Sequence, residues 1–178
     1  IALDGEPWWA CSAPDATWEA MWEIHVMSHV YAARACLPGM LRRGEGYFLS
    51  TASAAGLLSQ IGDAAYSTTK HAAIGFAESL AITHGDDGIR VSVLCPQAVA
   101  TRMVGDVSER AGAAAGVDGV ISPEQVAESV IEGLAAERFL ILPHPEVEQY
   151  RQNKAANYDR WLGGMRKMRR NLGFETGR

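Results

Sequence analysis

The sequence lacks a long apolar run and an excess of basic residues. A helix that crosses a membrane needs about 20 consecutive apolar residues, and no stretch of this sequence approaches that length. The formal net charge is -5, whereas a nucleic-acid surface needs a basic excess. We therefore expect neither a membrane nor a nucleic acid as a partner.

Cysteines are also scarce. Cys11, Cys36 and Cys95 are an odd number and show no metal-ligand spacing. Disulfides persist in oxidising compartments, so scattered single cysteines are typical of cytoplasmic proteins. We expect three reduced, buried thiols and a cytoplasmic location.

The composition is that of a globular protein. The chain has 178 residues, of which 48% are hydrophobic and 21% are charged. No linker, repeat or low-complexity tract divides it, so we expect a single domain over residues 1–178. The chain begins at Ile1 without a Met or a signal-peptide pattern. We expect the natural chain to begin further upstream.

Strand and helix patterns alternate in the middle of the chain. Gly46–Thr51 and Ile89–Cys95 are typical of strands, and the Ala-rich segment from Ala64 to Gly85 is typical of a helix. Strand, helix and strand at this spacing predict a βαβ unit with parallel strands and a right-handed crossover. The fold class that we expect is α/β, a doubly wound parallel sheet.

Helices and a short strand are expected on both sides of this unit. A long helix is predicted from about residue 17 to residue 43, with a kink at Pro38 or an end near Ala35. Ser122, followed by Pro123, predicts the start of another helix. The last two expected elements are a strand over 139–142 and one amphipathic helix over 146–172.

Three polar side chains around the central helix could carry chemistry. Tyr66 and Lys70 are four residues apart, which places them on one helix face. A phenol has an ordinary pKa of about 10 and becomes a useful base only when a neighbouring cation lowers that value. Ser53, thirteen residues before Tyr66, could hydrogen-bond the same oxygen that Tyr66 protonates. The three residues predict a proton-transfer site for hydride chemistry.

The position of these residues supports a single site. Ser53 and Pro96 each lie just after a predicted strand. Ligands of open parallel sheets bind outside the carboxyl ends of the strands. We therefore expect both residues at one ligand site.

The combined pattern resembles the short-chain dehydrogenase/reductase family. It consists of a strand, Ser53, Tyr66-x-x-x-Lys70, a second strand and the segment Pro96-Gln-Ala-Val-Ala-Thr101, and the resemblance runs from about Trp18 to at least Thr101. It implies the C-terminal part of a Rossmann-like fold, without the Gly-rich half that cradles the cofactor pyrophosphate. It also implies oxidation of an alcohol or reduction of a carbonyl with NAD or NADP, whose preference the sequence leaves open.

The resemblance assigns roles to individual residues. Ser53, Tyr66 and Lys70 are the implied catalytic residues, and Lys70 would also hold the nicotinamide ribose. Gln97 replaces a family Gly and would lie at the substrate together with Ser53 and Tyr66. The cofactor residues that the resemblance implies are Thr51, Tyr66, Lys70, Pro96, Gln97, Val99 and Thr101.

His25 departs from the family pattern. It occupies the position of an Asn that holds a water of the proton relay, and an imidazole titrates near pH 6.5. We expect the relay to be altered here, with His25 as a doubtful catalytic residue. His25 and His29 could suggest a zinc pair, but no third ligand is indicated, so we expect no metal. Residues 104–120 correspond to a variable substrate lid.

Two other functions remain open. The chain could be a catalytically incompetent fragment that acts as a binding or oligomerisation module, because family members pair the helices expected at 17–43 and 64–85 with those of another subunit. Either reading predicts a homo-oligomer, a dimer or a tetramer. A serine hydrolase based on Ser53 is the third option, although Ser53 lacks the Gly-x-Ser-x-Gly elbow.

Overall fold

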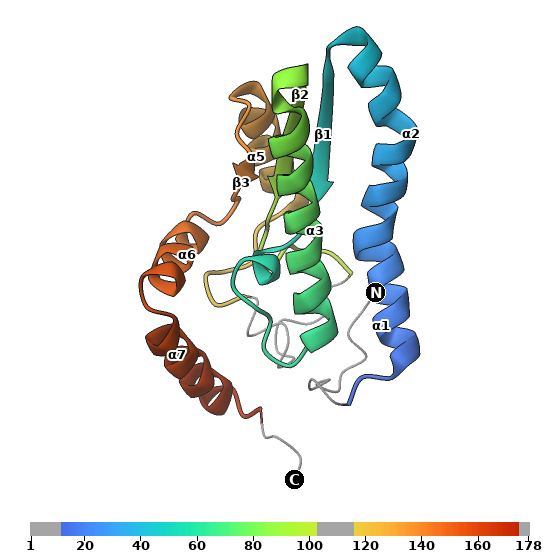
Figure 1. The fold of residues 1–178 in the computed structure, drawn as a ribbon. Helices are drawn as coiled ribbons and strands as arrows, with labels where there is room; N and C mark the ends of the chain where they lie inside the picture. The colour runs from blue at the N-terminus through green and yellow to red at the C-terminus, as the bar shows by residue number, and fades with distance from the viewer. Residues whose placement is uncertain (1–11, 103–115, 175–178) are drawn as a thin grey trace.

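The computed structural model describes residues 12–102 and 116–174. Its centre is a parallel sheet in the order β1-β2-β3, formed by Gly46–Thr51, Ile89–Leu94 and Leu140–Ile141. The register pairs Gly46 with Ile89 and Thr51 with Leu94, so β1 and β2 end at the same edge. The three strands and their parallel pairing confirm the predicted α/β fold (Figure 1).

The first helical segment is continuous but changes its winding. It consists of α1 (Asp15–Trp22), the π-helical η1 (Glu23–Met27) and α2 (Ser28–Arg43). Pro38 lies inside α2, so the predicted end near Ala35 is wrong. The helix stops instead at Gly44, whose left-handed φ of 69° suits a residue without Cβ.

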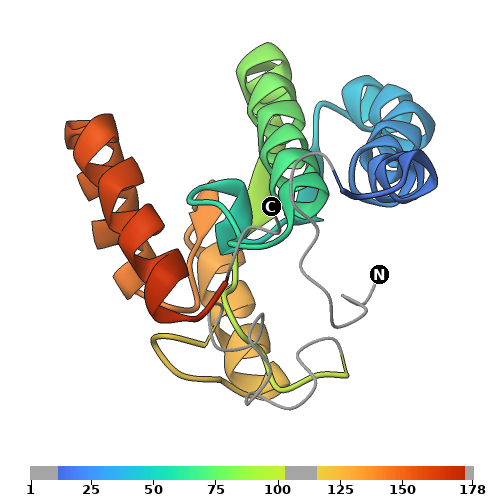
Figure 2. The same cartoon turned by 90° about the horizontal axis from the view of Figure 1, so that it is seen from below.

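The helix α3 (Ala64–His84) confirms the predicted central helix. Asp63 begins it, because its side chain accepts a hydrogen bond of 2.8 Å from the backbone N–H of Tyr66. Two short 3-10 turns flank the helix in sequence, η2 (Ala54–Gly56) and η3 (Gly85–Asp87). α2 and α3 cover one face of the sheet, and α5 (Pro123–Ala135) covers the other (Figures 1 and 2).

The start of α5 agrees with the sequence prediction. Ser122 accepts a hydrogen bond from the Gln125 backbone N–H, and the Gln125 side chain accepts one from the Ser122 N–H. This reciprocal pair satisfies two amide groups that the first helical turn leaves free. Pro123 follows at the first helical position, where no N–H is needed.

The predicted single helix over 146–172 is wrong. The structure has two helices, α6 (Glu146–Ala156) and α7 (Tyr158–Asn171). Asn157 separates them with an extended backbone, φ -156° and ψ 95°. Its side chain accepts a hydrogen bond of 2.9 Å from the Arg160 N–H and so begins α7.

The main core lies between α3 and the sheet. Buried Ile74 and Ala77 of α3 join a cluster with Val91 and Val93 of β2. Burial of such side chains contributes about 25 cal/mol for each Å² removed from water. A second cluster, around Ala54, Leu58 and Val147, connects η2 with α6.

The cysteines follow the sequence prediction only in part. Cys95 is a buried free thiol, but Cys36 is a free thiol on the exposed side of α2, so its predicted burial is wrong. Cys11 lies outside the described residues. In the described part of the chain, none of the helices combines the length and the apolar character that crossing a membrane requires.

Candidate active site

The candidate site begins where β1 and β2 end. Ser53 follows β1, and its hydroxyl donates to the Pro96 carbonyl after β2 at 3.4 Å. The Ala54 N–H donates to the same carbonyl at 2.9 Å. The two strand-end loops are therefore joined, as their positions in the sequence predict.

Ser53 also begins the turn η2. Its hydroxyl accepts a hydrogen bond of 3.1 Å from the Ala55 N–H. This contact fixes the start of the turn, and the Ser53 hydroxyl lies near enough to the Tyr66 phenol to lower its pKa. The structure therefore brings the Ser53 hydroxyl near that of Tyr66.

Lys70 completes the group. It is buried, and its amine lies 5.6 Å from the centre of the Tyr66 ring. The same amine donates to the Thr51 carbonyl at 3.4 Å. Because Asp63 fixes the first turn of α3, Tyr66 and Lys70 face the strand ends together. The structure thus brings Ser53, Tyr66 and Lys70 into one place.

The electrostatics of Tyr66 differ from the prediction. Tyr66 is partly exposed as a residue, yet desolvation of its phenol raises the pKa. The nearby Ser53 hydroxyl opposes this rise, while the negative charge of Asp63 adds to it. Lys70 is not among the groups that lower the Tyr66 pKa. The lowering expected from Lys70 is therefore not found.

The cause is that burial shifts the pKa of both Tyr66 and Lys70. It lowers the pKa of Lys70 as well, since a desolvated site favours the neutral form of each side chain. Burial also raises the pKa of the neighbouring Cys95 thiol to about 12. At neutral pH the structure therefore favours a protonated Tyr66 and a neutral thiol at this site.

His25 lies beside Tyr66. It belongs to the π-helical turn η1, a kind of irregularity that is frequent at functional sites. Its Nδ1 lies 2.9 Å from the Thr69 hydroxyl, and that hydroxyl donates to the Ala65 carbonyl at 2.8 Å. Nδ1 therefore carries the imidazole proton, and Nε2 keeps its lone pair. Burial and the charge of Lys70 lower the pKa of His25 to about 4.

The loop after β2 carries the remaining predicted residues. The Gln97 N–H donates to His144 Nδ1 at 3.2 Å, and the Gln97 side-chain oxygen is buried without a hydrogen-bond partner in the described chain. Val99 forms a parallel bridge with Ile121. Thr101 is exposed near the end of a described segment, and most of the predicted lid lies outside the described residues.

Two buried polar residues near the site have no counterpart in the sequence predictions. His144 is 2% exposed and contacts the loop after β2. Lys154 is 9% exposed, and its amine donates to the Leu57 carbonyl at 2.6 Å. The same amine lies 3.4 Å from His71 Nε2. Only tertiary contacts distinguish these residues from an ordinary loop histidine and a helix-surface lysine.

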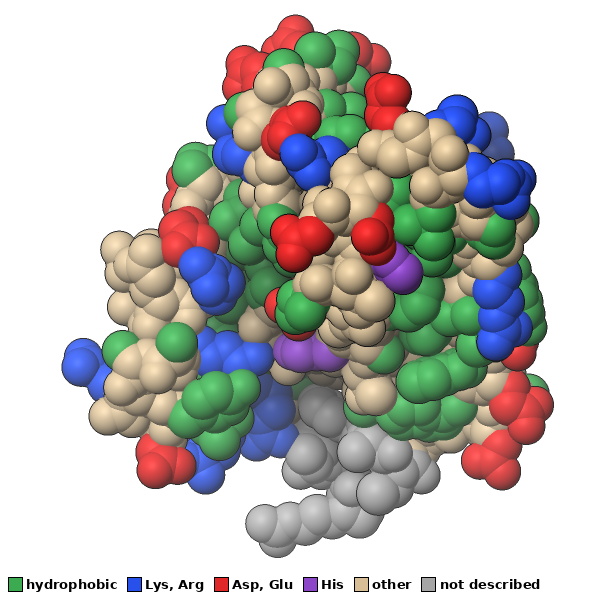
Figure 3. Space-filling model, turned by 45° about the horizontal axis from the view of Figure 1, so that its top comes forward, with side chains coloured by type: hydrophobic (Ala, Val, Ile, Leu, Met, Phe, Trp, Pro, Cys, Tyr) green, Lys and Arg blue, Asp and Glu red, His purple; other side chains and the backbone are tan. Residues whose placement is uncertain are grey.

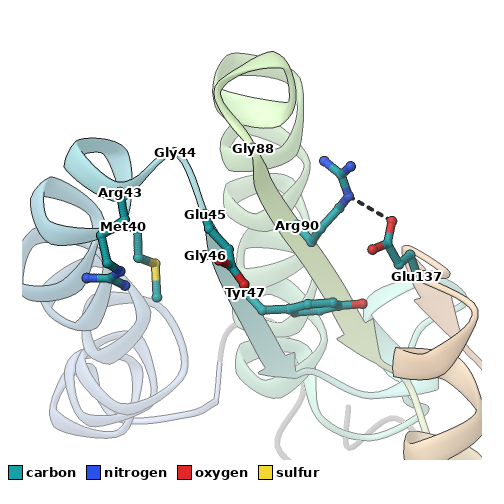
Figure 4. A pocket seen from close by; sticks show the side chains of 9 residues that line it. All are labelled: Met40, Arg43, Gly44, Glu45, Gly46, Tyr47, Gly88, Arg90 and Glu137. Carbon is teal, nitrogen blue, oxygen red and sulfur yellow. Dashed lines mark hydrogen bonds and ion pairs between the residues drawn. The ribbon is translucent and has the colours of Figure 1, made fainter.

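A separate hollow lies at the opposite end of the sheet. It has a volume of about 520 Å³, and an ion pair of 2.8 Å between Arg90 and Glu137 crosses its side (Figure 4). Parallel sheets bind ligands at the carboxyl ends of their strands, and this hollow lies at the amino ends. It is therefore distinct from the candidate active site. The residues that line it are Met40, Arg43, Gly44, Glu45, Gly46, Tyr47, Gly88, Arg90 and Glu137.

Two curated dehydrogenases are similar to this chain. The 1-deoxy-11-beta-hydroxypentalenate dehydrogenase of Streptomyces exfoliatus is 36% identical over 143 residues, which are 80% of this chain and 50% of the relative. Estradiol 17-beta-dehydrogenase 11 of Mus musculus is 31% identical over 126 residues, which are 69% of this chain and 40% of the relative. The chain thus spans about half the length of the curated relatives it matches.

A solved structure and a family model agree with these relatives. The crystal structure of a short chain dehydrogenase/reductase from Burkholderia phymatum in complex with NAD has a TM-score of 0.73 and 25% identity. The similarity covers 87% of this chain and 63% of that one. The family model of the short chain dehydrogenases matches residues 10–112. Together with the strand order and the parallel pairing, these matches show that the chain belongs to the short chain dehydrogenase family.

Proposed function

We propose that the full-length protein is an oxidoreductase that interconverts an alcohol and a carbonyl with NAD or NADP. The observation that carries this proposal is the meeting of Ser53, Tyr66 and Lys70 at the strand ends. The names of the two curated relatives, both dehydrogenases, support it. The substrate would be a small molecule with a secondary alcohol or the matching carbonyl.

The residues at the strand ends fit the nicotinamide end of such a cofactor. An ammonium has three donors, and Lys70 makes one hydrogen bond within the described chain, so donors remain for the ribose hydroxyls. The buried Gln97 side-chain oxygen lacks a donor among the described residues, and an amide such as the nicotinamide carboxamide would supply one. We place Thr51, Pro96, Val99 and Thr101 in the same cofactor site.

The protein side chains would handle the proton. When bound, the cofactor supplies or accepts a hydride at the substrate carbon. In the reductive direction Ser53 donates a hydrogen bond to the carbonyl oxygen and Tyr66 gives that oxygen its proton. The raised pKa of Tyr66 suits this direction, because the phenol holds its proton at neutral pH. Oxidation needs the phenolate and is therefore expected to require a more alkaline pH.

His25 would pass the proton between Tyr66 and solvent. Its ring contacts the Tyr66 ring, and Thr69 fixes the proton on Nδ1. The neutral imidazole then offers Nε2 as an acceptor on a ring that packs against the Tyr66 ring. We infer that His25 takes over the relay position that the family fills with Asn.

The test is Tyr66→Phe in the full-length protein. Loss of the proton donor should lower kcat about a thousandfold for carbonyl reduction, while the melting temperature and the circular dichroism spectrum stay unchanged. Tyr158→Phe is the matched control, since Tyr158 is exposed on α7 and lies outside the candidate site. Near-normal turnover in Tyr66→Phe contradicts the proposal.

We also propose that the protein is cytoplasmic and forms a dimer or tetramer through α1, α2 and α3. Hydrophobic side chains gather on the flank that α2 and α3 form (Figure 3). The large exposed hydrophobic residues of these segments are Trp22, Ile24, Tyr31, Leu41 and Ile82. Such a patch favours contact with another protein surface. Sedimentation of the full-length protein as a monomer at micromolar concentration contradicts this assembly.

The second candidate is a binding or assembly module without activity. It is favoured by the same exposed flank (Figure 3). Calorimetric titration of the 178-residue chain with NADH and NADPH separates the two candidates. Tight binding by this chain alone contradicts the module hypothesis.

A further inference from the structure

His144 is a buried imidazole that the proposed chemistry does not use. It lies in the turn between β3 and α6 and is 2% exposed. Its Nδ1 accepts a hydrogen bond of 3.2 Å from the Gln97 backbone N–H. His144 therefore connects the end of the third strand with the loop that follows the second.

This contact fixes the charge of the ring. A nitrogen that accepts a hydrogen bond carries no proton, so His144 is neutral and carries its proton on Nε2. A doubly protonated ring has two donors and no acceptor, and the Gln97 N–H would then lose its partner. Nε2 itself has no hydrogen-bond partner in the described chain.

The groups around the His144 ring shift its pKa in opposite directions. Burial lowers the pKa of His144, while the charges of Glu146 and Asp118 and the nearby carbonyls of Gly119 and Ala98 raise it. Burial is the largest of these influences, so the net direction is down. The described surroundings thus favour the neutral ring at neutral pH.

The contact reaches the candidate active site through the backbone. Pro96 precedes Gln97, and the Pro96 carbonyl accepts hydrogen bonds from the Ser53 hydroxyl and the Ala54 N–H. A shift of Gln97 would move this carbonyl and change the position of Ser53. The four residues form one path from the β3–α6 turn to the catalytic serine.

We propose that His144 is a positioning residue, whose neutral imidazole holds the Gln97 backbone and thereby the loop that binds the nicotinamide. This inference rests on the proposed function, since it assumes that the loop contacts the cofactor. We assign His144 a contact with the Gln97 backbone and none with the substrate or cofactor. Its protonation would release the loop and weaken cofactor binding.

The experiment compares two substitutions in the full-length protein. In His144→Asn the amide oxygen keeps an acceptor near the Nδ1 position and does not titrate, whereas His144→Leu removes the acceptor at a similar volume. His84→Asn is the matched control, because His84 pairs with Asp87 at the far end of α3. The dissociation constants of NADH and NADPH are measured by fluorescence from pH 8 down to about pH 4.5, since the pKa of His144 lies below 6.5, and kcat and KM are measured on the same samples.

Loss of a buried hydrogen bond should raise the dissociation constant of the preferred cofactor about tenfold in His144→Leu at pH 7.5. His144→Asn should stay close to the unsubstituted protein at that pH. Because burial lowers the pKa of His144 below 6.5, cofactor binding in the unsubstituted protein and in His84→Asn should weaken only as the pH falls well below that value. The same acidification should have less effect in His144→Asn.

Two results overturn the inference. One is equal cofactor affinity of the Asn and Leu variants, and the other is a pH profile of His144→Asn that coincides with the unsubstituted protein. If His144→Leu does not fold, the pH profiles of the unsubstituted protein, His144→Asn and His84→Asn still test the inference. Failure of the inference leaves the proposed function intact as long as Tyr66→Phe is inactive. Absence of NADH and NADPH binding in the unsubstituted protein overturns both.

Discussion

The imidazole of His25 stands edge-on to the phenol of Tyr66, with ring centroids 5.5 Å apart and an angle of 90° between the planes. Such an edge-to-face pair is favourable because the positive ring edge meets the negative ring face. Thr69 holds the imidazole in this orientation from the next turn of α3. The pair places a neutral nitrogen base beside the proposed proton donor.

This arrangement predicts a dependence of stability on pH. The unfolded chain protonates His25 near its ordinary pKa of 6.5, whereas the folded chain does so at about 4. Between these values the unfolded state binds more protons, so the free energy of unfolding falls as the pH is lowered. The loss is complete once the pH is below about 4. Urea denaturation at several pH values between 7 and 4 measures the slope.

The variant for this test is His25→Asn, which removes the titration. Its free energy of unfolding should vary less steeply with pH than that of the unsubstituted protein. His29 and His144 also have lowered pKa values and act in the same direction, so a residual slope should remain. Equal slopes for the variant and the unsubstituted protein would show that His25 is not held neutral by the fold.

Lys70→Met tests the buried ammonium. The substitution keeps much of the side-chain volume but removes the donors that we assign to the cofactor ribose. We expect a loss of kcat/KM of about a hundredfold or more, together with weaker cofactor binding. The melting temperature should fall little, because the bond lost to the Thr51 carbonyl is long, at 3.4 Å, and burial already disfavours the charged lysine. Activity within twofold of normal would remove Lys70 from the proposed site.

The raised pKa of Tyr66 predicts a difference between the two reaction directions. Carbonyl reduction uses the protonated phenol and should be active at neutral pH. Alcohol oxidation uses the phenolate, so its kcat should rise with pH above neutrality. The kcat of carbonyl reduction and of alcohol oxidation, each measured between pH 6 and 10, tests this difference in pH dependence. An oxidation rate already at its maximum at pH 6 is incompatible with the electrostatics of this site.

Lys154→Met should destabilise the fold near η2. The Lys154 amine donates to the Leu57 carbonyl at 2.6 Å, and its removal takes a donor from a carbonyl in the loop that carries Ser53. A lost buried hydrogen bond of this kind costs about 1–3 kcal/mol. Lys167→Met, on the exposed side of α7, is the control and should change the unfolding free energy by less than about 0.5 kcal/mol. Similar urea midpoints for both variants would show that the Lys154 contact is not stabilising.

Elements with local causes were predictable from the sequence. Ser122 and Gln125 form a capping box within one helical turn, and Tyr66 and Lys70 share a face because helix geometry places them there. The break at Asn157 was missed even though its cause is also local. The amphipathic pattern continues through this residue and hides the cap.

The amino-acid sequence by itself determined the βαβ order and the spacing of Ser53, Tyr66 and Lys70, because strand and helix periods depend on neighbouring residues. Only the tertiary structure decided the protonation of the site. The pKa of a side chain depends on how much water and charge surround it in space, and no local pattern specifies that environment. For this reason the burial that raises the Tyr66 pKa and the His144 contact with Gln97 became visible only in the folded chain.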